Sequence, residues 1–142
     1  MESAPPSTAG CSSAVQVDPY PTAEGTDVDC RALLADAPAL VADLAQRRVE
    51  DARIGAAWGD PPVVMRCGVD EPEALEPTSR CEVVAGIDWF TETTADGFLF
   101  TTIGRRVNVS VEVPAVHDPP ADVLVDLADT ISRHSPVEKP CT

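Results

Sequence analysis

The sequence predicts an α+β fold in which a four-stranded antiparallel sheet is flanked by an N-terminal and a C-terminal helix and cross-linked by disulfides. Three observations lead to this fold class. Apolar residues recur every three or four positions near both ends of the chain, short strand patterns lie between these regions, and five cysteines are scattered along the sequence. A chain of 142 residues has the size of one domain. We therefore expect residues 30–142 to form a single α+β domain.

Residues 1–29 are predicted to form a disordered tether, because they combine Pro, Ser, Thr, Ala and acidic residues with a single aromatic residue, Tyr20. Such a composition buries too little apolar surface to offset the entropy lost on ordering. The step Thr8-Ala9-Gly10-Cys11 resembles the end of a bacterial lipobox, with Thr8 where leucine is usual. No apolar run of signal-peptide length precedes it. Cys11 is therefore either a lipidation site at the end of a lipobox remnant or an ordinary residue of the tether.

The first helix is predicted to begin with Asp29 as its N-cap, because apolar residues then recur at helical intervals. These residues are Leu33, Leu34, Ala37, Leu40, Val41 and Leu44. Pro38 cannot occupy a helix interior, so we expect a break near Asp36 and a restart with Pro38 in the first turn. Arg47 and Arg48 would then end this proline-broken helix, since cations stabilise a helix C-terminus.

Four strands are predicted over residues 62–69, 82–90, 98–103 and 106–113. The first is a short apolar run, and the second mixes β-branched with aromatic residues. Asp96-Gly97 is a hairpin signal, and Gly104 allows a tight reversal. In the fourth strand valines alternate with polar residues, which is typical of a half-buried antiparallel strand.

The last helix is predicted to follow Asp118-Pro119-Pro120. Its apolar positions repeat helically while three aspartates lie on the other face. The apolar positions are Val123, Leu124, Leu127, Ala128 and Ile131. Both helices are expected to cover one face of the antiparallel sheet.

The cysteines favour an exported protein, since scattered cysteines form cross-links in oxidising compartments. They include no Cys-x-x-Cys pair and the chain has only two histidines, so we expect no metal site and no cofactor. Four domain cysteines allow three pairings. We favour Cys67 with Cys81, which would close the mouth of a long acidic loop, and by elimination Cys30 with Cys141. Closing a loop of about 15 residues would contribute roughly 3 kcal/mol.

The formal net charge of -14 argues against nucleic acid or an anionic lipid surface as a partner, because phosphate binding requires clustered cations. Membrane association would then depend on a lipid at Cys11. Standard enzyme signatures are absent from the sequence. Asp88 and Glu92 could serve as an acid/base pair, and Asp70, Glu71 and Glu73 as a calcium site, but in so acidic a chain solvated surface is the simpler interpretation.

Four residues, Trp58, Arg66, Trp89 and Arg105, are the candidates for a ligand or partner surface. Arg66 lies within an apolar strand, where its charge needs either an internal carboxylate or a ligand anion. The two tryptophans belong either to the core or, with an arginine beside them, to a contact surface for peptides or sugars. Arg105 lies at a turn, either as part of this surface or as a solvated reversal.

Several motifs in fixed order carry a family resemblance. They are WGDPPVVMRCGV from Trp58, Ser79-x-Cys81, GIDWF from Gly86, FTTIGR from Phe100, VEVP from Val111 and VLVDLAD from Val123. Together they resemble, over roughly residues 30–131, the actinobacterial family catalogued as domain of unknown function number 3515. The resemblance implies a small exported or lipid-anchored protein of the cell envelope with no assigned activity.

We therefore expect a non-catalytic, extracytoplasmic protein of the cell envelope, secreted or lipid-anchored, that binds an envelope protein or a cell-wall component. The alternative is a small secreted hydrolase that acts on cell-wall material through carboxylates such as Asp88 and Glu92.

Overall fold

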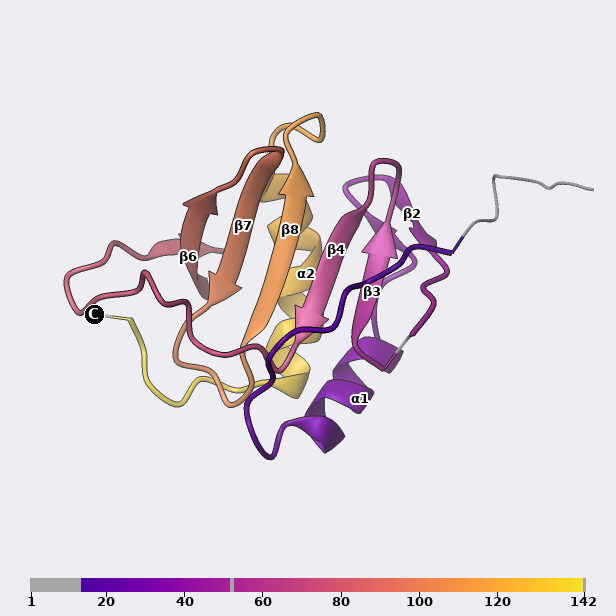
Figure 1. Ribbon diagram of the computed structural model, residues 1–142. Coiled ribbons are helices and arrows are strands. Elements are labelled where there is room, and N and C mark those ends of the chain that lie inside the picture. The colour runs from indigo at the N-terminus through magenta and orange to yellow at the C-terminus, as the bar shows by residue number, and fades with distance from the viewer. Residues whose placement is uncertain (1–13, 52, 142) are drawn as a thin grey trace, which may run out of the picture.

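The computed structural model describes residues 14–51 and 53–141, which form an antiparallel sheet with two helices on one face. Helix α2 (Ala121–His134) lies behind the sheet in Figure 1, and α1 (Asp27–Ala35) contacts α2 and the sheet. The predicted α+β class is confirmed. The predicted number of strands is wrong, because the described residues form one sheet of eight strands rather than four.

The strands follow the order β1-β2-β3-β4-β8-β7-β6-β5, and all neighbours are antiparallel. Their bounds are β1 (Leu40–Val41), β2 (Leu44–Arg47), β3 (Gly55–Trp58), β4 (Val63–Cys67), β5 (Glu82–Val84), β6 (Ile87–Thr93), β7 (Gly97–Thr102) and β8 (Val109–Pro114). The strand predicted over residues 82–90 is in fact two, β5 and β6. They are joined at Ala85 and Gly86, whose φ angles of 52° and 83° make a tight turn.

The second half of the predicted first helix is also wrong, since α1 ends at Ala35 and the chain continues as the hairpin β1–β2. Its turn is formed by Ala42 and Asp43, at φ 50° and 65°. β2 then pairs with β3. Pairing in the sheet satisfies the backbone of this segment, and it overrides a helical spacing of apolar residues that Pro38 had already weakened.

The last helix agrees with its prediction, because α2 begins directly after Pro120 and buries its apolar side. Leu124, Leu127 and Ile131 pack against strand residues on the inner face of the sheet. This inner face and the two helices form the main core. The opposite face of the sheet, which we call the outer face, carries the polar positions of β8.

Residues 14–29 differ from the predicted tether. Residues 14–22, which we call the strap, cross the outer face of β3 and β4 in Figure 1. Val15 and Val17 are buried there with Ala57 and Val64 in a small second core. These buried valines supply the apolar anchor that composition alone did not reveal. The remainder of the predicted tether, including Cys11, lies outside the described residues.

The four predicted domain cysteines are cross-linked, but the favoured pairing is wrong. The disulfides join Cys30 to Cys67 and Cys81 to Cys141, with Cα atoms 5.5 and 6.4 Å apart. The reason is the strand order, because β5 lies at the far edge of the sheet from β4. Residues 68–81, the acidic loop, cross the sheet, so their two ends do not meet.

Candidate functional site

The two tryptophans do not contribute to any surface. Trp58 and Trp89 are both 0% exposed within the main core. The indole of Trp58 donates a hydrogen bond to the carbonyl oxygen of Pro38 at 2.8 Å, and Trp89 packs edge-on against Phe100. Both tryptophans therefore belong to the core, and the alternative interpretation, a contact surface for peptides or sugars, is wrong.

Arg105 is also buried within the fold rather than exposed at its surface, with 8% of its surface accessible. Its Nε donates to the carbonyl oxygen of Ser135 at 2.7 Å, which holds the end of α2 against the β7–β8 connection. Burial lowers the pKa of the Arg105 guanidinium, and the nearby Asp88 carboxylate opposes this shift. The Nε group of Arg105 is therefore occupied within the fold.

Arg66 is the one candidate of the four that reaches the outer face. Its Nη1 lies 3.0 Å from Oε1 of Glu112 on the neighbouring strand β8. Its guanidinium carbon lies 6.0 Å from the centre of the Tyr20 ring, which belongs to the strap. Arg66 thus pairs with a carboxylate, as one interpretation required, and it also lies at the wall of a groove.

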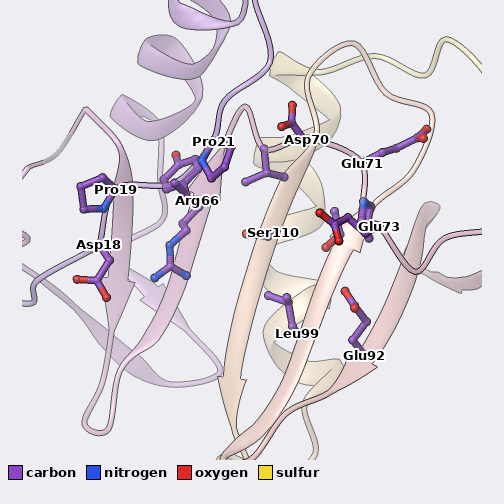
Figure 2. A pocket seen from close by; sticks show the side chains of 14 residues that line it. Asp18, Pro19, Pro21, Arg66, Asp70, Glu71, Glu73, Glu92, Leu99 and Ser110 are labelled. Atoms are coloured by element: carbon purple, nitrogen blue, oxygen red, sulfur yellow. The ribbon is translucent and has the colours of Figure 1, made fainter.

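The groove is a hollow of about 430 Å³ between the strap and the start of the acidic loop, over the outer face of the sheet. In Figure 2, Arg66 lies on the strap side, Glu73 and Glu92 lie on the opposite side, and Ser110 lies between them. A second hollow of about 540 Å³ adjoins the first at Asp18 and Arg66. We refer to both hollows together as the outer groove.

The floor of the outer groove carries two buried hydroxyl groups without partners. Ser110 on β8 and Thr101 on β7 are cross-strand neighbours and are 6% and 3% exposed. Neither hydroxyl has a hydrogen-bond partner within residues 14–51 and 53–141. The only fully enclosed side-chain polar atom without a partner in these ranges is Nε1 of Trp89, so both hydroxyls open into the groove. Buried polar groups are normally paired, which makes these two hydroxyls candidates for ligand contacts.

Sequence reasoning missed this floor although the alternation of β8 contained the signal. Ser110 and Glu112 occupy the polar positions between the valines of that strand, so they share the outer face with Arg66. The walls had no comparable signal, because they come from the strap and the acidic loop.

Tyr20 fixes the strap wall through three backbone groups. Its hydroxyl oxygen lies 2.6 Å from the carbonyl oxygen of Ile54 and 2.7 Å from that of Cys67, which are alternative acceptors for its proton. It also accepts the backbone N–H of Cys67 at 3.1 Å. Burial raises the pKa of the Tyr20 phenol, and the hydrogen bond to Cys67 opposes this shift.

We predict that the Tyr20 phenol of the folded protein titrates above its ordinary pKa of 10.0. The raised pKa favours the neutral phenol in the folded state, so this stabilisation is complete below pH 10.0 and is lost as the pH rises through the folded pKa. Tyr20 is the only tyrosine of the chain, so ultraviolet absorbance of the phenolate reports on it alone. The denatured chain is the control. A folded midpoint at or below that of the denatured chain would contradict the docking of the strap.

Asp88 and Glu92, the carboxylates that were considered for catalysis, have different surroundings. Asp88 and Glu92 lie four residues apart along β6, which separates their Cα atoms by about 13 Å. Oδ2 of Asp88 accepts the backbone N–H of Cys141, whereas Glu92 lines the groove.

No metal site is found in the described ranges, where His, Cys, Asp and Glu side chains form no group of three or more that could hold an ion. Asp70, Glu71 and Glu73, the residues considered for calcium, line the groove wall. None of the helices in the described part of the chain is long and apolar enough to cross a membrane.

Residues 6–140 match the model of a family described as "Protein of unknown function (DUF3515)". No curated protein and no solved structure matches the sequence.

Proposed function

We propose that this chain, which belongs to the family of proteins of unknown function DUF3515, is a non-catalytic, extracytoplasmic protein. In this proposal it binds an elongated ligand in the outer groove. The observation that supports this most directly is the pair of unpartnered hydroxyls of Ser110 and Thr101 on the groove floor. A ligand that supplies hydrogen bonds to both would satisfy groups that the fold leaves open.

The elongated form of the ligand follows from the shape of the site. The two hollows adjoin at Asp18 and Arg66 and extend from the acidic loop to Pro61 and Pro114. The Arg66–Glu112 ion pair lies where the hollows meet, with the Arg66 side chain 19% exposed. A compact ligand would fill one hollow, whereas an extended one would contact both and pass over this ion pair.

The extracytoplasmic location is supported by the two disulfides, since such bonds persist in oxidising compartments. Lipidation at Cys11 is part of the same proposal. Cys11 precedes Ala14, the first described residue, by three positions, which limits their Cα separation to about 10 Å. A lipid on Cys11 would therefore hold the strap and its groove close to the membrane, where envelope proteins and cell-wall components are accessible.

Retention of soluble envelope components on the immobilised protein tests the proposed function. The probes are a detergent extract of an envelope fraction and soluble fragments of peptidoglycan and arabinogalactan. The double variant Thr101→Val/Ser110→Val removes both floor hydroxyls. We expect it to retain at least about tenfold less of the component that the wild type binds, because each buried polar group of the ligand would lose a partner.

A matched control is Thr93→Val, which removes an exposed hydroxyl on the same sheet outside the groove. It should retain the component as well as the wild type. The proposal is overturned if the wild type retains nothing from any probe, or if the double variant and the Thr93 variant retain equal amounts.

A further inference from the structure

We infer that the ligand of the outer groove is an extended basic peptide segment, presented by a partner protein. This inference rests on the proposed function and specifies the ligand of the same site. It combines the charge of the groove walls, the open hydroxyls of the floor, and the way in which the outer face already holds an extended segment of this chain.

The walls carry an uncompensated negative charge. Seven carboxylates line the two hollows against a single guanidinium, that of Arg66. The seven are Asp18, Asp70, Glu71, Glu73, Glu92, Asp96 and Glu112. Only Glu112 has a cation partner, Arg66, among the residues that the structure describes. Arg66 is thereby neutralised, so the groove as a whole attracts cations.

The carboxylates are distributed rather than gathered at one point. Asp70, Glu71 and Glu73 lie in the acidic loop at one end, and Asp96 lies near the other. The described residues hold no metal-binding cluster, as noted above. Separated carboxylates along a groove match a ligand with several separated cations, such as the side chains of lysine and arginine along an extended peptide.

The hydroxyl groups of the floor favour a peptide over free small cations as the ligand. Ser110 and Thr101 offer both donors and acceptors, and the backbone of an extended peptide presents both as well. The strap shows that this face of the sheet accepts such a segment. The strap crosses β3 and β4 in extended form, and the side-chain hydroxyl of Tyr20 anchors it by hydrogen bonding to backbone carbonyl groups outside the strap. A second extended segment would lie beside the strap, over β8 and β7.

Fluorescence anisotropy of a labelled oligolysine peptide tests this inference. Oligolysine should bind the wild type at least about tenfold more tightly than its fully acetylated counterpart, and its affinity should fall as salt is added. The variant Glu73→Gln/Glu92→Gln should lose about tenfold in affinity for oligolysine. Thr101→Val/Ser110→Val should weaken binding as well, since the inference places the peptide on the floor.

Because the whole chain has a net charge of -14, the matched control must remove the same charge elsewhere. Glu24→Gln/Glu50→Gln does so at two exposed positions that do not line the groove. It should leave the affinity for oligolysine within about twofold of the wild type. If both glutamate pairs cause the same loss, net charge alone explains the binding and the inference is wrong.

Two further outcomes separate this inference from the proposed function. Retention of a neutral or anionic envelope component that depends on the floor hydroxyls, together with weak oligolysine binding, would overturn the basic peptide and leave the binding function intact. Tighter binding of an oligosaccharide of glucosamine than of oligolysine would overturn the peptide in favour of an amino sugar. If neither oligolysine nor any envelope component depends on the hydroxyls, both proposals fail.

Discussion

Replacing Cys30 and Cys67 together by alanine should lower the free energy of unfolding by about 4 to 5 kcal/mol. The two cysteines are 37 residues apart, so the cross-link restricts a long loop of the unfolded chain and contributes about 4 kcal/mol by chain entropy. Both cysteines are also buried in the main core, between α1 and β4, so their loss leaves a small cavity. Domains of this size have a total stability of about 5 to 15 kcal/mol, so the variant would be close to unfolding.

The matched control is Cys81→Ala/Cys141→Ala. Its sequence separation of 60 gives a chain-entropy contribution of about 4 kcal/mol as well, but both cysteines are only partly buried. We therefore expect a smaller loss than for the core pair, by about 1 kcal/mol. Urea unfolding of both variants measures the difference. An equal or larger loss for the peripheral pair would contradict the assigned role of the core disulfide.

The sequence contained enough information to predict α2 and the strand β8. The apolar residues of α2 recur at helical spacing, and those of β8 alternate with polar residues. Each element packs one face against the core. Such elements can be recognised because burial of a single face determines the positions of their apolar residues. Residues 40–47 do not have this property. Their apolar spacing fits a helix, but they fold as a hairpin because β3 offers them a pairing edge.

The disulfide pairing could not be predicted, because it depends on strand order rather than on distance along the chain. Cys67 and Cys81 are close in sequence, but β8, β7 and β6 separate β4, which contains Cys67, from β5, which Cys81 precedes. Cys67 instead faces α1, which the sheet brings next to β4. The entropy of closing a loop in the unfolded chain changes only slowly with loop length. It therefore gives no basis for choosing between the possible disulfide pairings.

The candidate site could be predicted in part. Arg66 was identified correctly as a charged residue in an apolar strand that needs a carboxylate, and that carboxylate is Glu112. For Trp58 and Trp89 the sequence allows either the core or a contact surface, and strand alternation places both side chains on the inner face with Met65. The groove itself depends on the strap and the acidic loop, whose positions only the folded chain defines.

Ser135→Ala should lower the free energy of unfolding by about 2 to 6 kcal/mol, although it removes a single oxygen atom. Ser135 is 0% exposed, and its hydroxyl bonds with both backbone groups of Val107. The hydroxyl accepts from Val107 N–H at 2.9 Å and donates to Val107 C=O at 2.7 Å. Alanine would leave both of these groups buried without a partner, at a cost of about 1 to 3 kcal/mol each.

The same substitution at Ser79 is the control, because the hydroxyl of Ser79 accepts one hydrogen bond from Glu76 N–H in the exposed acidic loop. Water can replace that bond, so we expect a loss of about 0.5 to 1 kcal/mol. Urea unfolding of the two alanine variants compares them directly. Equal losses would mean that the hydroxyl of Ser135 does not lock the end of α2 to Val107.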